Sequence, residues 1–410
     1  MFTISNQNTA LPIKTWLGSV DEIEGQCLEQ AYNLSNLPFL HKWVALMPDT
    51  HTGMGMPIGA IIAAKDVIIP NAVGVDIGCG MGFIGTDVKV SEIKDIKTGN
   101  GTFIQTIVSD ILRNIPVGFE KHRDIQTSAV LDLAKAQLDK YTATSALLEH
   151  IDAGYYQVGT LGGGNHFIEI QEDDKGYLGI MLHSGSRNFG KQVCDLFHKK
   201  AVELNKKMGT TVAADHRLAY FPVDTPEGQQ YINWMNLALN FAQENREKMM
   251  LKVKEIFERA IDKHTQLNFS YTDEINAHHN YATLETHFGE KVWVHRKGAI
   301  SAKMDELGII PGAMGSYSYI VKGLGNEDSF MSSSHGAGRR LSRTEAKKHY
   351  TVEEVMSDLN SVGVTLGKKK KKDVAEESRF AYKDIDQVME NQKDLVTPIK
   401  KLTTLGVVKG

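Results

Sequence analysis

The sequence is short of cysteine and of long apolar runs, and each shortage excludes a class of protein. Only three cysteines, Cys27, Cys79 and Cys194, occur among 410 residues, too few for a small extracellular fold built on disulfides. No run reaches the roughly 18 apolar residues of a membrane-spanning helix, because Lys65-Asp66 and several glycines interrupt the longest one. The N-terminus lacks the basic and apolar regions of a signal peptide. These features predict a reducing, cytoplasmic setting.

The sequence also lacks an excess of charge of one sign. Its 46 basic and 50 acidic residues give a formal net charge of -4, so a nucleic-acid partner would have to be held by a local basic patch. The 10 prolines form no proline-rich linker, and no internal repeat is present. We therefore expect one large domain over residues 1–410.

Hydrophobic spacing predicts both helices and strands. Apolar residues recur every three or four positions over 104–115, which indicates an amphipathic helix. A longer helix is expected to begin at Thr225-Pro226-Glu227, with threonine as N-cap and proline in the first turn, and to run past Ile256. Short apolar runs bounded by glycines predict strands at 60–69, 167–170, 177–182 and 292–294.

The 37 glycines gather in loops that also carry histidine, aspartate or cysteine. These loops span residues 51–59, 73–82, 159–166, 183–187 and 332–340. Glycine permits positive φ angles and close backbone approach, so such loops commonly surround phosphates or metals. A single loop of this kind would be interpreted as a tight turn, whereas five with the same pattern indicate a functional site.

One set of polar residues has the composition of a metal site. Asp76 and Cys79 stand three residues apart on a glycine-rich turn and could share one cation, the thiol losing its proton to the metal. A buried structural cysteine beside a turn-capping aspartate is an equally good interpretation. His166, His183 and the pair His278-His279 would complete a ligand set. Ligand chemistry alone favours zinc first, then manganese or iron.

A different kind of site surrounds His335. Small residues lie on both sides of it, Ser332 to Ser334 before it and Gly336 after it. Arg339 and Arg343 follow. Guanidinium groups bind phosphates in a bidentate manner, and a neutral imidazole can attack phosphorus to give a phosphoramidate. The loop is therefore either a nucleophile site or an anion-binding loop in which His335 only donates a hydrogen bond.

Taken together, these motifs resemble a known family, the RtcB-type RNA-splicing ligases, which join RNA 2′,3′-cyclic phosphate or 3′-phosphate ends to 5′-hydroxyl ends. The resemblance covers the whole chain. It is carried by Met47-Pro-Asp-Thr-His51, Val73-Gly-Val-Asp-Ile-Gly-Cys-Gly80, Gly164-Asn-His-Phe-Ile-Glu169, His183-Ser-Gly-Ser-Arg187, His278-His-Asn280, Arg296-Lys-Gly298, Ser334-His-Gly-Ala-Gly-Arg339, Ala381-Tyr-Lys-Asp-Ile-Asp386 and Val408-Lys-Gly410. It implies an α+β fold, one large domain with mixed β-sheets flanked by helices.

The resemblance also implies roles for individual residues. His335 would be guanylylated by GTP. Two manganese ions would be held by Asp76, Cys79, His166, His183 and His279. His279 is chosen over its neighbour because it directly precedes the asparagine. The guanine nucleotide would be bound by Asn165, Glu169, Ser318, Tyr382 and Lys409. The RNA ends would meet Arg187, Arg339 and Arg343.

The implied reaction serves tRNA splicing or RNA repair. A cyclic phosphate is opened, GMP passes from GTP to His335 and on to the RNA 3′-phosphate, and the 5′-hydroxyl then displaces GMP. Each step crowds charge on phosphoryl oxygens and so requires a Lewis acid and cationic side chains. Two alternatives remain: a metal-dependent phosphoesterase that only opens cyclic phosphates, and a non-catalytic RNA-end binding protein. The presence of His335 and Lys409 argues against the phosphoesterase.

Some positions depart from the family pattern. Ala313 and Met54 stand where relatives often have serine and lysine, which bears on nucleotide affinity or RNA-end preference more than on the chemistry. The run Lys368 to Lys372 is expected to be a solvated loop rather than an RNA contact.

Near the C-terminus, Leu405 to Val408 is apolar enough to dock as a strand, which would hold Lys409 against the core. We expect Lys409 to read guanine together with Glu169, since a buried carboxylate left unpaired by adenine is costly.

Overall fold

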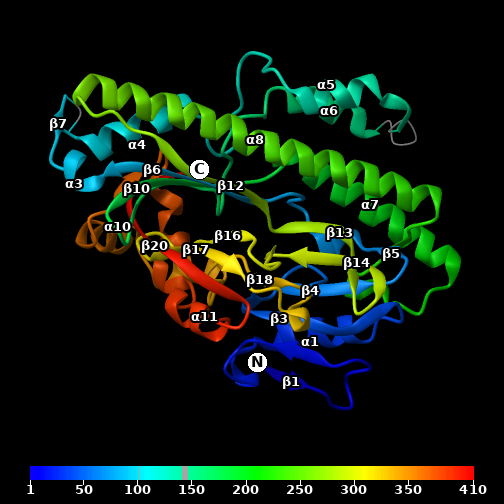
Figure 1. The fold of residues 1–410 in the computed structure, drawn as a ribbon. Coiled ribbons are helices and arrows are strands. Elements are labelled where there is room, and N and C mark those ends of the chain that lie inside the picture. The colour runs from blue at the N-terminus through cyan, green and yellow to red at the C-terminus, as the bar shows by residue number, and fades with distance from the viewer. Residues whose placement is uncertain (100, 141–145) are drawn as a thin grey trace.

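The computed structural model describes residues 1–99, 101–140 and 146–410, which form two large mixed β-sheets with helices around them (Figure 1). The expected α+β class, mixed sheets flanked by helices, is confirmed. That the whole chain is a single domain stays a prediction.

The first sheet contains much of the N-terminal part of the chain. Its strands lie in the order β1 (Phe2–Ile4), β2 (Ile13–Thr15), β3 (Leu40–His51), β4 (Ile58–Ala64), β14 (Glu290–Lys297) and β13 (Asn280–His287). Strands β2 and β3 pair in parallel, and the other neighbours are antiparallel.

The second sheet positions the site described below. Its order is β12 (Tyr271–His278), β6 (Gly80–Lys89), β10 (Tyr177–Ser184), β9 (Phe167–Asp173), β20 (Val396–Lys409), β17 (Tyr317–Gly323) and β16 (Leu307–Ile310), with β19 (Thr365–Gly367) beside β20. The small two-stranded sheets pair β5 (Val67–Ile68) with β11 (Phe221–Pro222), β7 (Lys97–Thr98) with β8 (Gly101–Thr102), and β15 (Ala299–Ser301) with β18 (Ser332–Ser334).

Helices cover the sheets. The α-helices are α1 (Gly25–Ser35), α2 (Pro70–Val73), α3 (Val90–Ile93), α4 (Phe103–Asn114), α5 (Ala129–Ala136), α6 (Leu148–Gly154), α7 (Arg187–Met208), α8 (Pro226–His264), α9 (Arg343–His349), α10 (Val352–Ser361) and α11 (Ile385–Asn391). Short 3-10 turns are η1 (Val20–Glu22), η2 (Leu138–Lys140), η4 (Ala214–His216), η5 (Glu327–Ser329), η6 (Lys371–Glu377) and η7 (Arg379–Ala381). None of the helices in the described ranges combines the length and apolarity needed to cross a membrane.

Helix α8 shows how the sequence specifies the fold. The Thr225 hydroxyl accepts a hydrogen bond from the Gly228 amide at 3.1 Å, and Pro226 occupies the first turn, so the expected start is confirmed. Its apolar stripe, including Trp234 and Phe241, is fully buried against α7 and the second sheet, along which the helix runs in Figure 1. The shorter predicted helix is confirmed as α4.

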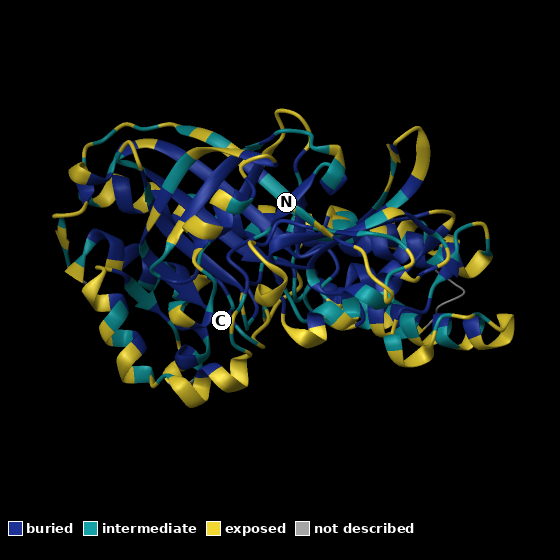
Figure 2. Cartoon of the chain, turned by 90° about the horizontal axis from the view of Figure 1, so that it is seen from below, coloured by how far each residue is buried: buried dark blue, intermediate teal, exposed yellow. Residues whose placement is uncertain are grey.

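The predicted strands are largely confirmed, with one correction. The run 60–69 is not one strand: β4 ends at Ala64 and β5 begins at Val67. Asp66 lies between them with a φ angle of 56°, a left-handed conformation that cannot continue a strand. Leu405 to Val408 does dock, as part of β20 between β9 and β17. Most of the strands lie in the buried interior, and the exposed residues lie mainly on the outer helices and loops (Figure 2).

Candidate active site

The candidate metal ligands meet at one edge of the second sheet. Cys79 directly precedes β6, His166 precedes β9, His183 lies near the end of β10, and His279 follows β12. Because these strands are neighbours in the sheet and alternate in direction, the strand ends that carry the ligands lie side by side. His183 is paired with Met81 of β6 on one side and with the first residue of β9 on the other. Residues separated by as many as 200 positions are thereby placed side by side.

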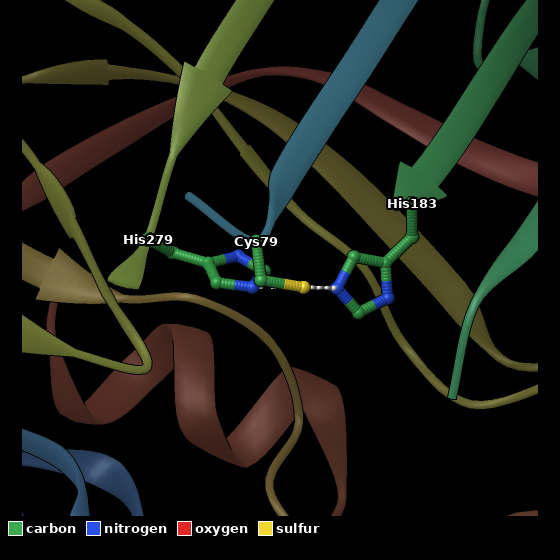
Figure 3. A group of neighbouring side chains, drawn as sticks. All are labelled: Cys79, His183 and His279. Carbon is green, nitrogen blue, oxygen red and sulfur yellow. Dashed lines mark hydrogen bonds between the residues drawn. The ribbon is translucent and has the colours of Figure 1, made fainter. Parts of the chain in front are cut away.

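Two groups of three potential ligands share one sulfur atom. In the first, the Cys79 Sγ lies 3.2 Å from His183 Nε2, which lies 3.3 Å from His279 Nε2. Figure 3 shows these three side chains converging from three different strands. In the second, the same Sγ lies 3.5 Å from His166 Nε2, which lies 3.1 Å from Asp76 Oδ2. Within each group, the ligand atoms are no more than 4.8 Å apart.

The backbone fixes the tautomers of two of these histidines. His166 Nδ1 lies 3.0 Å from the Leu161 carbonyl oxygen, and His183 Nδ1 lies 3.1 Å from the Asn165 carbonyl oxygen. A carbonyl oxygen only accepts, so each Nδ1 carries the hydrogen and each Nε2 directs its lone pair into the cluster. This is the neutral, oriented form in which imidazole binds a metal.

The electrostatics of the cluster fit a bound cation. Burial raises the pKa of the Cys79 thiol well above its ordinary value and lowers the pKa of His183 and His279 well below theirs. For Asp76 burial acts to raise the pKa, but the interactions with its neighbours His166, Cys79 and Arg187 together lower it. A divalent cation would offset this desolvation and ionise the thiol. Sulfur, imidazole and carboxylate together suit manganese, iron or zinc.

His335 faces the same space as this cluster. A cavity of about 750 Å³ extends from His183 and His279 to His335, whose ring centroid lies 4.8 Å from that of His279. Other expected site residues that line it are Asn165, Glu169, Arg339, Arg343, Tyr382 and Lys409. Potential ligands, a histidine and cationic side chains thus share one cavity.

Asp49 orients His335, a role that the sequence interpretation missed. Its Oδ2 lies 2.7 Å from His335 Nδ1 and accepts the His335 backbone N–H at 3.1 Å. The side chain of Asp49, on β3, is fully buried. Gly298 packs against the imidazole, where a Cβ would lie 3.0 Å from the ring and 2.3 Å from Ile58. Asp49 stands inside the Met47 to His51 motif, which was the one signal available.

Glu377 is the second residue that was missed. Its Oε2 pairs with Lys409 Nζ at 2.8 Å and accepts the Tyr382 hydroxyl at 2.8 Å, and its Oε1 lies 3.4 Å from Arg339 Nη1. Burial opposes ionisation of Glu377, but its interactions with Lys409, Arg339 and Tyr382 together outweigh burial and lower the pKa. The structure therefore pairs Lys409 with Glu377 rather than with Glu169.

Glu169 lies on the same cavity with different partners. Its Oε2 accepts from Gln171 Nε2 at 2.7 Å and from the Thr404 hydroxyl at 3.1 Å. Burial raises the pKa of Glu169 to about 7. The Ser318 hydroxyl accepts the backbone N–H of Gly312, a cavity residue, at 3.1 Å, so Ser318 supports the wall without lining it.

Arg187 lies away from the His335 cavity. Its Nε donates to the Thr160 hydroxyl at 3.1 Å and its Nη2 to the Gly118 carbonyl at 3.3 Å. Gly162 packs against the guanidinium so closely that a Cβ there would lie 2.1 Å from Nη1. Arg343, in contrast, lies over the loop that carries Asn165, next to Gly164.

Arg246, from α8, secures the strand ends behind the cluster. Its Nη1 donates to the carbonyls of Gly78 at 2.8 Å and Ser184 at 3.1 Å, and its Nη2 lies 3.1 Å from His278 Nδ1. His278 is therefore directed towards Arg246 and its neighbour His279 towards the cluster. Of the two departures from the family pattern, Ala313 lines the cavity and Met54 is exposed.

The sequence of the chain is also similar to those of known proteins. A family profile described as tRNA-splicing ligase RtcB matches residues 30–410. The RNA-splicing ligases RtcB1 and RtcB of two Escherichia coli strains are each 39% identical over 404 residues, covering 97% of both chains. The tRNA-splicing ligase RtcB of Thermococcus kodakarensis is 31% identical over 450 residues, covering 94% of this chain and 92% of its own. The protein is an RNA ligase. More specifically, it belongs to the RtcB family.

Proposed function

We propose that the enzyme joins RNA 2′,3′-cyclic phosphate or 3′-phosphate ends to 5′-hydroxyl ends, with GTP as cosubstrate and two manganese ions, in tRNA splicing or RNA repair. One observation carries this proposal: His335, oriented by the buried Asp49, faces the same cavity as His183 and His279, which belong to one of the two ligand groups that share Cys79. A phosphoryl-transfer enzyme needs a nucleophile and a charge-stabilising centre within reach of one phosphate.

The ligand groups divide naturally into two ion sites. One ion would be held by Cys79, His183 and His279, and the other by Asp76, Cys79 and His166. Manganese bound there would supply Lewis acidity towards phosphoryl oxygens. We also propose a cytoplasmic location, since the free Cys79 thiol is best preserved in a reducing compartment.

His335 is the proposed nucleophile. The Asp49 carboxylate accepts the hydrogen of Nδ1, which leaves the lone pair on Nε2. Nε2 attacks the α-phosphorus of GTP, a P–N bond forms, and pyrophosphate leaves. An oxygen of the RNA 3′-phosphate then attacks the same phosphorus, the P–N bond breaks, and Nε2 recovers its lone pair.

The last step forms the phosphodiester. The RNA 5′-hydroxyl attacks the 3′-phosphorus, loses its proton, and GMP leaves. Asn165 and Arg343 stand together on the cavity, and their N–H groups are proposed to stabilise the charge on phosphoryl oxygens. Arg187 and Arg339 are proposed to bind the RNA ends.

Guanine would be read by the far end of the cavity. The Glu169 carboxylate could accept from guanine N1–H and N2–H, donors that adenine does not present in this arrangement, and a buried carboxylate left without them is costly. Lys409, fixed by Glu377, keeps further N–H groups for guanine O6 or N7. Ser318 and Tyr382 are proposed to complete this pocket.

The decisive experiment is incubation with labelled GTP and Mn²⁺ followed by denaturing electrophoresis. We expect an acid-labile, alkali-stable adduct on the wild-type chain and on a His216→Ala control. His335→Ala should give no adduct and no ligation, yet still join RNA that already carries 3′-linked GMP. Ligation by His335→Ala at the wild-type rate would refute the nucleophile. Opening of cyclic phosphates without an adduct would identify a phosphoesterase. If the wild-type chain neither opened cyclic phosphates nor formed an adduct, it would be an RNA-end binding protein.

A further inference from the structure

Phe119 is exposed in an unusual way. Its relative exposure is 109%, the highest of any large apolar side chain in the ranges that the structure describes. Exposed apolar area of this size is unfavourable in water, by roughly 25 cal/mol per Å². An aromatic ring held in solvent is a surface on which a planar partner can stack.

The loop that carries Phe119, residues 116–123, is fixed to the metal-ligand loop. The Leu161 amide donates to the Pro116 carbonyl at 2.9 Å, and the Gly118 amide donates to the Gly162 carbonyl at 2.8 Å. The Leu161 carbonyl is the group that accepts from His166 Nδ1. Gly118, which directly precedes Phe119, is thus hydrogen-bonded to the segment that orients the candidate ligand His166.

Arg187 makes a second connection between this loop and the cluster. Its Nη2 donates to the Gly118 carbonyl, and its charge helps to lower the pKa of Asp76. Phe119 therefore follows directly on a residue that Arg187 contacts, and that residue, Gly118, also lies beside Gly410 at the end of the chain.

Cationic side chains lie on and beside the loop that carries the ring. Glu120 pairs with Lys369 at 2.5 Å, which places the exposed side chains of Lys369 to Lys371 beside the loop. Lys121 and Arg123, on the loop itself, are exposed as well. Because the chain as a whole is acidic, with a net charge of -4, this local gathering of cations is complementary to a phosphate backbone.

We propose that Phe119 is a base-stacking platform for the RNA strand that enters the site, and that Lys370 and Lys371 bind the phosphates of the same strand. This rests on the proposed RNA-joining function and assigns a path to its substrate. An aromatic ring beside a row of cations is the usual combination for single-stranded nucleic acid. The lysine run, first interpreted as a solvated loop, thereby becomes an RNA contact.

The test uses a labelled single-stranded RNA with a 3′-phosphate end and measures its Kd by fluorescence anisotropy. Phe119→Leu keeps the apolar character but removes the aromatic face, and we expect Kd to rise about tenfold, equivalent to about 1.4 kcal/mol. A second RNA lacks the base that stacks on Phe119, because an abasic residue stands at that position. This RNA should bind wild type and Phe119→Leu with equal Kd. Leu251→Ala removes another exposed apolar side chain, on α8, and should change nothing.

The lysines are tested by salt. Replacing Lys370 and Lys371 by glutamine should lower the slope of log Kd against log salt by about one per lysine, whereas Phe119→Leu should leave that slope intact. Guanylylation of His335 without RNA should proceed normally in both variants, which shows that the fold persists. Unchanged Kd and slope in these variants would overturn the proposal. RNA binding is measured without ligation, so this result is independent of whether the wild-type chain ligates.

Discussion

Replacing Asp49 by asparagine should slow the guanylylation of His335 while leaving the later chemistry intact. The carboxylate accepts two hydrogen bonds from His335, at 2.7 Å from Nδ1 and 3.1 Å from the backbone. A hydrogen bond to a charged group contributes about 1.5–3 kcal/mol, so weakening the shorter one predicts a guanylylation rate about 10- to 150-fold lower. If the amide turns its NH₂ towards the ring, Nε2 receives the hydrogen and the loss is deeper. The same change in a serine protease triad costs about 10⁴-fold.

The assay separates orientation from folding. Single-turnover guanylylation with labelled GTP measures the step that needs Nε2, and joining of RNA already carrying 3′-linked GMP measures the step that does not. Asp328→Asn is the matched control, because it loses an ion pair with Lys14 outside the cavity. The reasoning fails if Asp49→Asn guanylylates at the wild-type rate, or if both steps decline equally.

Three further predictions concern the cluster and the nucleotide pocket. Cys79→Ala removes the sulfur that both ligand groups share, so manganese content by mass spectrometry and ligation should fall together while circular dichroism is retained; unchanged manganese would make the turn merely structural. Because burial raises the pKa of Glu169 to about 7, above the ordinary 4.5, the unliganded fold should lose stability as pH rises through about 7. GTP affinity should rise over the same pH range, and Glu169→Gln should weaken the pH dependence of both stability and GTP affinity. Lys409→Met leaves Glu377 buried without its closest cation and should lower unfolding stability by about 3–5 kcal/mol. Adding Glu377→Gln should recover stability but not guanylylation, and a stable Lys409→Met single variant would contradict the ion pair's importance.

The sequence predicted best those features that depend on neighbouring residues. Helix α8 was recognisable because its cap, its proline and its apolar period all lie within one segment. The docking of β20 followed from four apolar residues in a row. The break between β4 and β5 was missed, since a positive φ at Asp66 is a local choice that apolar composition does not reveal.

Pairings between distant segments were harder to predict. Asp49 and His335 are 286 residues apart, so sequence shows two polar residues but not their hydrogen bond. Glu377 follows a lysine run and has no feature in the sequence that sets it apart, although it is buried against Lys409. Arg246, on a long helix, would be interpreted as a surface charge, yet it is 1% exposed. In each case the missing information is tertiary.

The arrangement of the ligands at the ends of β6, β9, β10 and β12 has a consequence for how the protein folds. Strand β6 pairs with β10 and β12 across long stretches of chain, and such non-local pairing is slow to form. The ligand groups therefore do not exist until the sheet has closed, and the manganese proposed to bind them would bind the native state alone. By mass action, the melting temperature should rise with free manganese, and a chelator should lower it. Metal supply during expression would then govern the yield of folded protein as well as its activity.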